Sequence, residues 1–218
     1  MPPGVNDTCI VLIPKMPHLE HLKDFWPINL CNVIYKVVSK CIVNRLRPLL
    51  QDLIAPNQSA FIPGRMITDN ALIAFEYLHA INSNADERSK FCAYKLDLSK
   101  AYDRVEWCFL RKVLLELGFQ STWVDRVMTC VTSVRYTVRF NGVMSAPFTP
   151  TRGLQQGDPL SPYLFLFVAD GLSTLINSKV STGTLKELQV CRNAPGVSHL
   201  LFADDTLFFS KPQLIRQR

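Results

Sequence analysis

The 218-residue sequence lacks the features of secreted, membrane-spanning and zinc-knuckle proteins. Its seven cysteines are scattered and no two form a CxxC pair, which favours a reducing compartment and free thiols in the core. No apolar run is long enough to span a bilayer, and the N-terminus lacks the basic-then-apolar layout of a secretion signal. Internal repeats and low-complexity tracts are also missing. These absences predict an intracellular protein without a membrane partner, for which the nucleus is one candidate compartment.

Negative charge is missing from one stretch of the chain. No acidic residue occurs between Asp24 and Asp52, although four basic ones do: Lys36, Lys40, Arg45 and Arg47. The whole chain has a net charge of +6, which favours polyanionic partners without proving them. Its apolar fraction of 48% is enough for a sizeable core, so roughly one or two domains are expected at this length.

Three segments have the pattern of strands. Residues 9–14 are a short apolar run that ends at a proline, which predicts a buried strand. Residues 91–98 also have the pattern of a strand. Residues 134–140 alternate apolar and polar side chains and lead directly into Asn141-Gly142, the strongest hairpin signal in the chain.

Two longer segments have helical periodicity. After Pro27, apolar residues recur at steps of three to five, which predicts a long helix with a break near Arg47, the residue before a proline. We expect its apolar stripe to be buried and its basic residues to lie largely off that stripe. The stripe comprises Leu30, Ile34, Val37, Cys41, Leu46, Leu49 and Leu53. Residues 160–178 predict a second apolar helix, and strands mixed with helices without regular alternation favour an α+β fold.

Two adjacent carboxylates, Asp204 and Asp205, stand between two apolar runs, residues 198–202 and 206–209. This pattern predicts a strand, a tight turn and a second strand. Like charges this close repel one another, and a bound divalent cation removes that cost. Mg²⁺ takes carboxylate oxygens and keeps waters for substrate phosphates. A solvated turn is the plain alternative, because aspartate is a favoured turn residue.

A third carboxylate, Asp97, falls at the end of the strand predicted for residues 91–98. Strand ends are common places for aspartate, so a loop acid is again the plain alternative. Beside Asp204 it would complete a carboxylate cluster able to hold two metal ions, which can activate an attacking hydroxyl and stabilise a leaving pyrophosphate. The two residues are far apart in the sequence, so only the fold can bring them together.

Several segments resemble the motifs of reverse transcriptases. FCAYKLDLSKAYDRVEW, TRGLQQGDPLSPYLF and HLLFADDTLFF are similar to three successive motifs of that family, and the similarity is greatest to the long-interspersed-element type without long terminal repeats, as found in plants. VLIPK, HLKDFWPINLCNVIYKVVSK, NRL and NQSAFIPGRMITDN resemble its amino-terminal motifs in the right order. The resemblance covers essentially the whole chain.

The resemblance implies a set of metal-binding and catalytic residues. Asp97 and Asp204 would be metal ligands, with Asp205 beside them and the backbone carbonyl of Leu98 as an added ligand. The cofactor would be two Mg²⁺ ions, with Mn²⁺ as a substitute. The implied reaction is transfer of a nucleotide onto the 3′-hydroxyl of a primer, by an RNA-directed DNA polymerase.

The resemblance also implies residues that contact nucleotides. Tyr102 would be the aromatic gate against the 2′-hydroxyl of the incoming sugar. The alternative is a ring packed at the start of a helix, and the two roles are compatible. Gln156 and Gly157 would lie against the nascent base pair and the incoming nucleotide. Lys15 and Arg65 would touch triphosphate or template, and for each a solvated basic residue is the alternative. The implied partners are an RNA template with a DNA primer and deoxynucleoside triphosphates, and no protein partner can be inferred.

The implied fold is the fingers and palm of a right-hand polymerase, with an antiparallel palm sheet, flanking helices and no thumb. Fingers would comprise residues 1–90, and 121–150 would return to the fingers with a hairpin. The palm would comprise residues 91–120 and 151–218, and would be truncated after the FADD segment.

One residue departs from the family pattern within the matched motifs. The family usually has arginine at the position of Trp26, and that arginine is expected to meet the incoming triphosphate, which tryptophan cannot do. This departure and the truncation after the FADD segment leave open whether this chain is an active enzyme. The alternatives are an inactive remnant with a nucleic-acid-binding surface and a small metal-dependent phosphohydrolase. The last explains neither Tyr102 nor the QGDPLSP loop.

Overall fold

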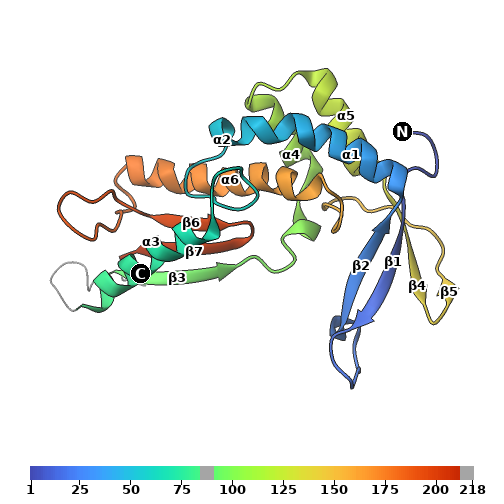
Figure 1. The fold of residues 1–218 in the computed structure, drawn as a ribbon, viewed down its shortest axis with the longest axis horizontal. Coiled ribbons are helices and arrows are strands. Elements are labelled where there is room, and N and C mark those ends of the chain that lie inside the picture. The colour runs from blue at the N-terminus through green and yellow to red at the C-terminus, as the bar shows by residue number, and fades with distance from the viewer. Residues whose placement is uncertain (84–90, 212–218) are drawn as a thin grey trace, which may run out of the picture. The chain divides into compact units, whose positions relative to one another are not determined.

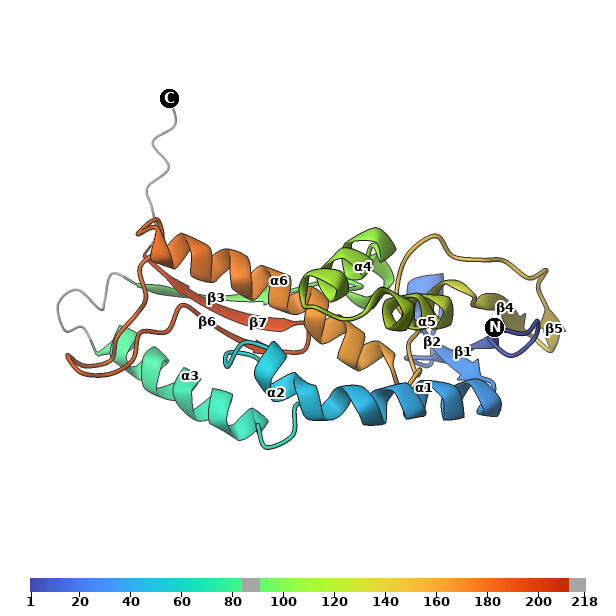
Figure 2. The ribbon, with the colours of Figure 1, turned by 90° about the horizontal axis from the view of Figure 1, so that it is seen from above.

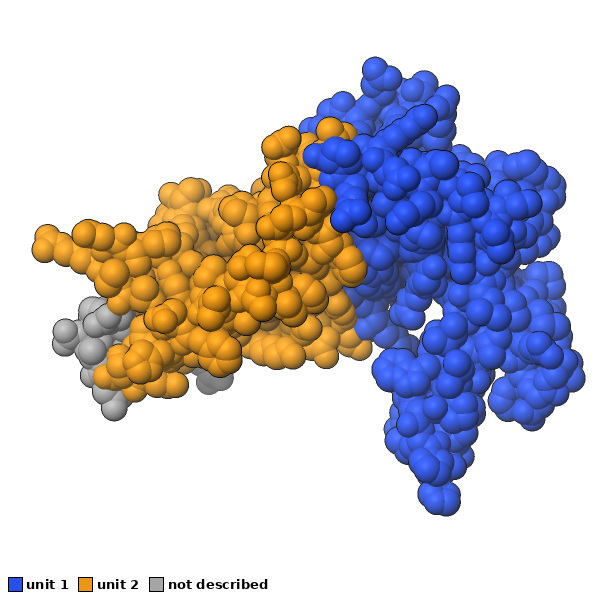
Figure 3. Space-filling view, viewed as in Figure 1, with its two compact units in different colours: residues 1–48, 100–165 blue, residues 49–99, 166–218 orange. Residues whose placement is uncertain are grey.

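The computed structural model describes residues 1–83 and 91–211, which form two compact units (Figure 3). Unit 1 comprises Met1–Pro48 and Lys100–Phe165, and unit 2 comprises Leu49–Ser99 and Leu166–Arg218. These boundaries follow packing. The division into fingers and palm names functional parts instead, and its boundaries stay a prediction.

Unit 1 combines two strands and one α-helix of residues 1–48 with elements that follow residue 100 (Figure 1). They are β1 Asp7–Pro14, β2 Phe25–Cys31, α1 Val33–Leu46, α4 Trp107–Glu116, α5 Ser121–Thr132, β4 Arg135–Phe140 and β5 Val143–Met144. Unit 2 contains α2 Leu50–Leu53, α3 Ile67–Asn82, β3 Cys92–Asp97, β6 His199–Phe202 and β7 Asp205–Ser210. Helix α6, Ser161–Ser181, supplies its first turn to unit 1 and the rest to unit 2.

The sheet of unit 1 has the strand order β2-β1-β4-β5. β1 is antiparallel to β2 and parallel to β4, and β4 and β5 form an antiparallel hairpin. Asn141 and Gly142 connect that hairpin with φ of 48° and 82°, the left-handed pair that a type I′ turn requires. The predicted hairpin is therefore confirmed. The predicted strand at residues 9–14 is confirmed within β1, but most of its side chains are only half-buried.

The predicted helix after Pro27 begins later than expected. Residues 25–31 form strand β2, which lies at the edge of the sheet, where a proline removes no ladder hydrogen bond. Helix α1 begins at Val33 because the Asn32 side chain caps it, accepting a hydrogen bond from the Ile34 backbone N–H at 2.9 Å. The predicted break is confirmed, since α1 ends at Leu46 and a short 3-10 turn begins at Arg47.

The face of α1 that packs inward is not the predicted apolar stripe. Ile34 and Val37 are exposed to 60% and 59%, and the buried residues of α1 are Tyr35, Ser39, Val43 and Leu46. Tyr35 determines which face of α1 points inward, because its hydroxyl donates a hydrogen bond to the buried Asp158 carboxylate at 3.0 Å. Leu46 of the predicted stripe is buried, but the expectation was wrong for the other stripe residues of α1. The basic residues of this stretch are exposed: Lys36, Lys40, Arg45 and Arg47.

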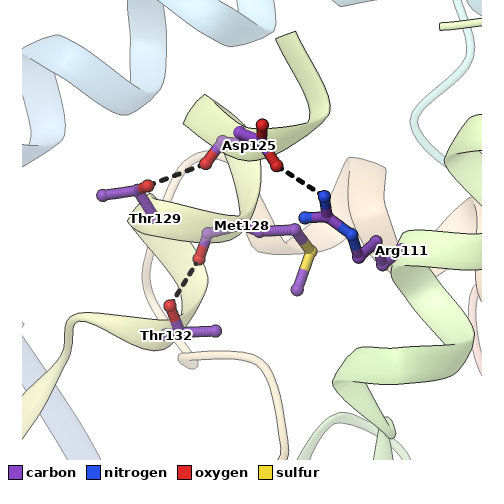
Figure 4. A network of polar contacts seen from close by, with 5 residues as sticks. All are labelled: Arg111, Asp125, Met128, Thr129 and Thr132. Carbon is purple, nitrogen blue, oxygen red and sulfur yellow. Dashed lines mark hydrogen bonds and ion pairs between the residues drawn. The ribbon is translucent and has the colours of Figure 1, made fainter. Parts of the chain in front are cut away.

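Helices α4 and α5 follow one another in unit 1. Glu106 precedes α4 as its N-cap residue, and Gly118 ends the segment with a φ of 86°. An ion pair between Arg111 of α4 and Asp125 of α5, at 2.6 Å, joins the two helices on their exposed side (Figure 4). Helix α5 was missed in the sequence, although it buries a clear apolar face: Val124, Val127, Met128, Cys130 and Val131.

Unit 2 is a three-stranded antiparallel sheet with the order β3-β7-β6, between α3 on one face and α6 on the other (Figure 2). Tyr77 of α3 packs in a buried cluster with Phe209 of β7 and Leu200 of β6. On the opposite face, Ser173 of α6 hydrogen-bonds the buried ring of His199. The strand predicted at 91–98 and the helix predicted at 160–178 are thus confirmed as β3 and α6. Among the described residues no helix is both long and apolar enough to cross a membrane.

Candidate active site

The carboxylate pair lies at the turn between β6 and β7, as the pattern predicted. Leu201 and Phe209 are almost wholly buried in the flanking strands, so the turn projects from a rigid apolar base. Ala203 has a φ of 54°, a conformation that residues with a side chain rarely adopt. Asp204 is half-buried and Asp205 is exposed. A positive φ is typical of a two-residue hairpin turn, but alanine has a steric cost there that glycine avoids, so surrounding contacts must hold this conformation.

The third carboxylate is brought to the same hairpin. Asp97 ends β3 and lies directly opposite Asp205 in the antiparallel register of β3 and β7. Directly opposed residues of an antiparallel pair project to the same face, with Cα atoms about 4.5–5.5 Å apart. Residues distant in the sequence therefore meet, and the register puts Asp205 rather than Asp204 opposite Asp97. Had β3 ended elsewhere in the sheet, the proposed cluster would not exist.

A lysine lies among these acids. The Lys95 ammonium is 3.3 Å from the Asp205 carboxylate, with both side chains largely exposed. Within the described residues, no three acidic, histidine or cysteine side chains converge as a ready metal site. The donor set nevertheless fits a hard divalent cation in kind, because Asp97, Asp205 and the adjoining Asp204 offer carboxylate oxygens at one end of the sheet. Leu98, the carbonyl suggested as a further ligand, follows the last residue of β3 and is exposed.

A neighbouring segment, residues 55–60, holds the turn from the side. Gln58 is 1% exposed, and its side-chain oxygen accepts a hydrogen bond from the Ala203 backbone N–H at 2.9 Å. The side-chain amide donates to the Ala203 carbonyl at 3.3 Å. The sequence motif NQSAF marked this segment only through its resemblance, and no role for Gln58 was predicted. Nothing in the sequence around Gln58 indicated that its side chain is buried.

Arg65 is engaged with the same segment. Its guanidinium donates to four backbone carbonyls: Gln51, Ile54, Ala55 and Gln58. Burial lowers the pKa of Arg65, and the Asp170 carboxylate partly offsets that shift. Asp170 in turn accepts a hydrogen bond from the Ala55 backbone N–H at 2.9 Å, and burial raises its pKa. These bonds make Arg65 a clamp on the backbone rather than a solvated basic residue, and its contact with triphosphate or template stays a prediction.

Tyr102, the predicted gate, lies in unit 1. Its ring stacks on Phe165, with centroids 4.7 Å apart and planes at 13°. Its carbonyl accepts a hydrogen bond from the Leu154 backbone N–H at 2.8 Å, which ties it to the Gly/Pro-rich loop. Gly153 of that loop has a φ of 94°, and a Cβ there would lie 3.0 Å from the Asp103 carbonyl oxygen. The loop therefore needs glycine to approach the Tyr102 segment so closely.

Gln156 and Gly157 are exposed at the tip of the same loop. Gly157 has a φ of 84°, and a Cβ there would touch the Asn29 carbonyl at 3.4 Å. The next residue, Asp158, is buried and accepts hydrogen bonds from Tyr35, Ser161 and the Leu160 backbone N–H. Burial raises the pKa of Asp158. Asp158 thus anchors the loop and leaves the two residues before it at the surface.

Lys15 follows the last residue of β1 and lies near Trp26 of β2, whose partner in the strand register is Ile13. The Lys15 ammonium lies 4.5 Å from the centroid of the Trp26 ring and donates to the Lys23 carbonyl at 2.7 Å. Trp26 is 59% exposed. The aromatic side chain at the position where the family usually has arginine therefore holds the predicted nucleotide-contacting lysine.

The structure groups the predicted residues by unit. Unit 2 holds Asp97, Leu98, Asp204 and Asp205, together with Arg65. Unit 1 holds Lys15, Tyr102, Gln156 and Gly157. The carboxylates are gathered at one hairpin, and Tyr102 is tied to the QGDPLSP loop.

Comparison with known proteins decides the family. The family model described as reverse transcriptase (RNA-dependent DNA polymerase) matches residues 13–215. The chain belongs to the reverse transcriptase family. The prediction made from the FADD and QGDPLSP segments is therefore confirmed.

Two curated relatives of this reverse transcriptase chain are transposon proteins. Each is 29% identical to this chain, and each match covers 98% of this chain. One is the transposon TX1 uncharacterized 149 kDa protein of Xenopus laevis. The other is the retrovirus-related Pol polyprotein from the type-2 retrotransposable element R2DM of Drosophila melanogaster. The chain spans 16% and 19% of these two proteins. These matches confirm a reverse transcriptase domain of the retrotransposon kind.

A solved structure shows the same fold. Telomerase from Candida albicans, in complex with the TWJ fragment of telomeric RNA, superposes with a TM-score of 0.63 at 14% identity. The match covers 99% of this chain and 39% of that one. At this identity the likeness concerns the fold, and it confirms the predicted mixture of helices with a mostly antiparallel sheet.

Proposed function

We propose that this chain is the part of an RNA-directed DNA polymerase that transfers nucleotides onto a primer 3′-hydroxyl. One observation supports this most: the register of β3 and β7, which places Asp97 opposite Asp205 beside the Asp204 turn. Membership of the reverse transcriptase family supplies the reaction class. The template is RNA, the primer is DNA and the substrates are deoxynucleoside triphosphates.

Asp97, Asp204 and Asp205 would hold two divalent cations, Mg²⁺ or Mn²⁺, with help from the Leu98 carbonyl. Bound there, the cations supply charge stabilisation to the attacking and leaving oxygens of an in-line displacement. Asp205 must release Lys95 to serve as a ligand, which costs little because the ion pair is exposed. The carboxylates themselves are oriented by the strand ends that carry them.

In unit 1, Tyr102 is proposed as the gate against a 2′-hydroxyl, with its ring backed by Phe165. A stacked ring has little freedom to move aside, so an added hydroxyl would meet it. Gln156 and Gly157 are proposed to contact the nascent base pair from their exposed loop. Arg65 acts through the backbone it clamps, and Lys15 is proposed to reach triphosphate or template only after leaving Trp26.

The finer assignments are part of the same proposal. Residues 1–90 and 121–150 would serve as fingers, and 91–120 and 151–218 as palm. The FCAYKLDLSKAYDRVEW and HLLFADDTLFF segments support a long-interspersed-element type as found in plants. The chain spans less than a fifth of each of the two curated relatives.

A primer-extension assay tests the proposal. The 218-residue chain is given an RNA template, an annealed DNA primer, deoxynucleoside triphosphates and Mg²⁺. Asp204→Asn should lower extension by at least about 100-fold, since metal-held charge stabilisation is worth several kcal/mol. The matched control is Asp52→Asn, which removes an exposed acid of α2 in the same unit and should leave extension unchanged. Extension that survives Asp204→Asn would show that the carboxylate assignment is wrong.

A second candidate function has its own supporting observation. Trp26 holds the Lys15 ammonium away from any phosphate, which favours an inactive remnant that keeps a nucleic-acid-binding surface. The exposed basic residues of α1 would supply that surface: Lys36, Lys40 and Arg45. This candidate predicts no extension but RNA binding that weakens steeply with salt and ignores sequence. Extension by the wild-type chain would exclude it.

A further inference from the structure

We propose that Gln58 is a positioning residue for Asp204. It holds both backbone groups of Ala203, the residue that sets the direction of the carboxylate-bearing turn. This inference rests on the proposed function for the role of Asp204 as a metal ligand. The conformational part, that Gln58 holds the turn, stands on geometry alone.

The contact is specific to the turn. Ala203 takes a left-handed φ of 54°, which turns its N–H and carbonyl toward the segment that carries Gln58. The Gln58 side-chain oxygen also accepts from the Ala60 backbone N–H at 3.0 Å, so the amide cannot rotate without losing bonds on its own segment. Ala203 is 8% exposed, and water has little access to replace the glutamine. A side chain that satisfies both backbone groups of a strained residue selects that conformation.

Gln58 is itself held in place by backbone pairing. Its segment forms a parallel bridge to β6, with the Leu201 backbone N–H donating to the Asn57 carbonyl at 2.8 Å and the Ser59 N–H donating to the Leu201 carbonyl at 3.1 Å. Asn70 of α3 donates to the Leu201 carbonyl at 2.8 Å. The pairing aligns residues 57–59 with the strand that leads into the turn.

Arg65 completes the support, since its guanidinium donates to the Gln58 carbonyl at 2.8 Å and to the Ala55 carbonyl at 2.7 Å. The order of contacts is therefore from Arg65 to the Gln58 backbone, from the Gln58 side chain to Ala203, and from Ala203 along the chain to Asp204. All of these residues belong to unit 2. The arrangement makes the direction of the Asp204 carboxylate depend on an amide that is distant in the sequence.

The test uses Gln58→Met, which keeps the length of the side chain and removes its hydrogen bonds. Two properties of the 218-residue chain are measured: hydrogen exchange of the Ala203 amide by nuclear magnetic resonance, and Mn²⁺ affinity by electron paramagnetic resonance. Exchange at Ala203 should become at least about tenfold faster, because its only side-chain acceptor among the described residues is gone. Unchanged exchange would overturn the proposal whatever Mn²⁺ does.

The control is Asn57→Ala, which removes a side-chain hydrogen bond to the His199 carbonyl on the same strand without touching Ala203. It should leave both readouts within about twofold of wild type, since its lost bond lies away from the turn. Circular dichroism establishes that each variant is folded. If Gln58→Met does not fold, Gln58→Leu replaces it, because leucine also lacks the acceptor for the Ala203 N–H and should give the same faster exchange.

A double-mutant cycle separates positioning from general destabilisation. Gln58→Met should weaken Mn²⁺ binding about tenfold in the wild-type background and not at all when Asp204 is already asparagine. An equal loss in both backgrounds would overturn the positioning role. If Asp204→Asn alone leaves Mn²⁺ affinity unchanged, the proposed metal function fails, and the exchange rate at Ala203 still decides whether Gln58 holds the turn.

Discussion

Acid should destabilise this protein through one buried histidine. His199 begins β6 and is fully buried, with its two ring nitrogens 2.7 Å from the Ser173 hydroxyl and 2.9 Å from the Ser198 hydroxyl. Burial lowers its pKa to about 4. A serine hydroxyl accepts a hydrogen bond as readily as it donates one, so protonation leaves both contacts possible. The cost is the loss of hydration by a charged ring.

The size of the effect follows from the two pKa values. The unfolded chain protonates this histidine near pH 6.5, and the folded chain only near pH 4. Between these values the unfolded state binds more protons, so the free energy of unfolding falls as the pH falls. A difference of about 2.5 pH units corresponds to roughly 3.4 kcal/mol. The contribution is fully present above pH 6.5 and lost by about pH 4.

Urea unfolding followed by circular dichroism, at several pH values from 7 to 4, measures this loss. The comparison is with His199→Asn, which retains polar atoms but cannot gain a proton. At pH 7 the variant should be less stable by about 1–3 kcal/mol, because the ring packing is lost. That deficit should shrink, or reverse, by roughly 3 kcal/mol on going to pH 4.

Two other groups titrate in the opposite sense and cancel in the comparison. Burial raises the pKa of Asp158 and of Asp170, so both add stability as the pH falls toward their folded values. Wild type and variant share them, and only the difference between the two proteins reports His199. Parallel stability profiles from pH 7 to pH 4 would refute the reasoning, since they would mean that the buried ring carries no proton penalty.

Three further substitutions give expected outcomes of different sizes. Lys95→Met should change the free energy of unfolding by less than about 1 kcal/mol in urea titrations, because its ion pair with Asp205 is exposed; a loss of several kcal/mol would contradict the exposed geometry. Arg65→Lys should lower the free energy of unfolding by about 2–3 kcal/mol in urea titrations, because one ammonium cannot bond four carbonyls. A urea midpoint equal to that of wild type would argue against the clamp. Trp26→Arg should raise nucleotide affinity about tenfold or more in fluorescence titration, by adding a charge-assisted donor; unaltered affinity would exclude that role for the position.

Local backbone chemistry determined the elements that the sequence predicts well. Asn141-Gly142 favours the left-handed pair of a hairpin turn wherever it stands, and the break at Arg47 follows from the proline after it. Asp97 ends its strand and Asp204 lies in a tight turn, both as predicted. These features depend on neighbours within a few residues, which the sequence displays.

The facing of α1 and the beginning of β2 were decided by tertiary structure. Both faces of α1 carry apolar residues, so periodicity alone could not choose between Val37 and Tyr35. The face that carries Tyr35 packs inward because Asp158 of the QGDPLSP loop offers a buried hydrogen-bond acceptor there. Residues 25–31 became a strand because β1 pairs with them, although their own pattern continues a helix.

The candidate site divides in the same way. The acidic and loop residues could be predicted from their motifs, because their chemistry is carried by residue type and short spacing. The role of Arg65 as a backbone clamp could not be predicted, and neither could that of Gln58, since a glutamine's role depends on which backbone groups it reaches. Ala203 lies 145 residues further along the chain than Gln58. The amino-acid sequence by itself determined which groups are available for chemistry. Only the folded sheet, by pairing distant backbone segments, determined which of those groups meet and how firmly the turn between them is held.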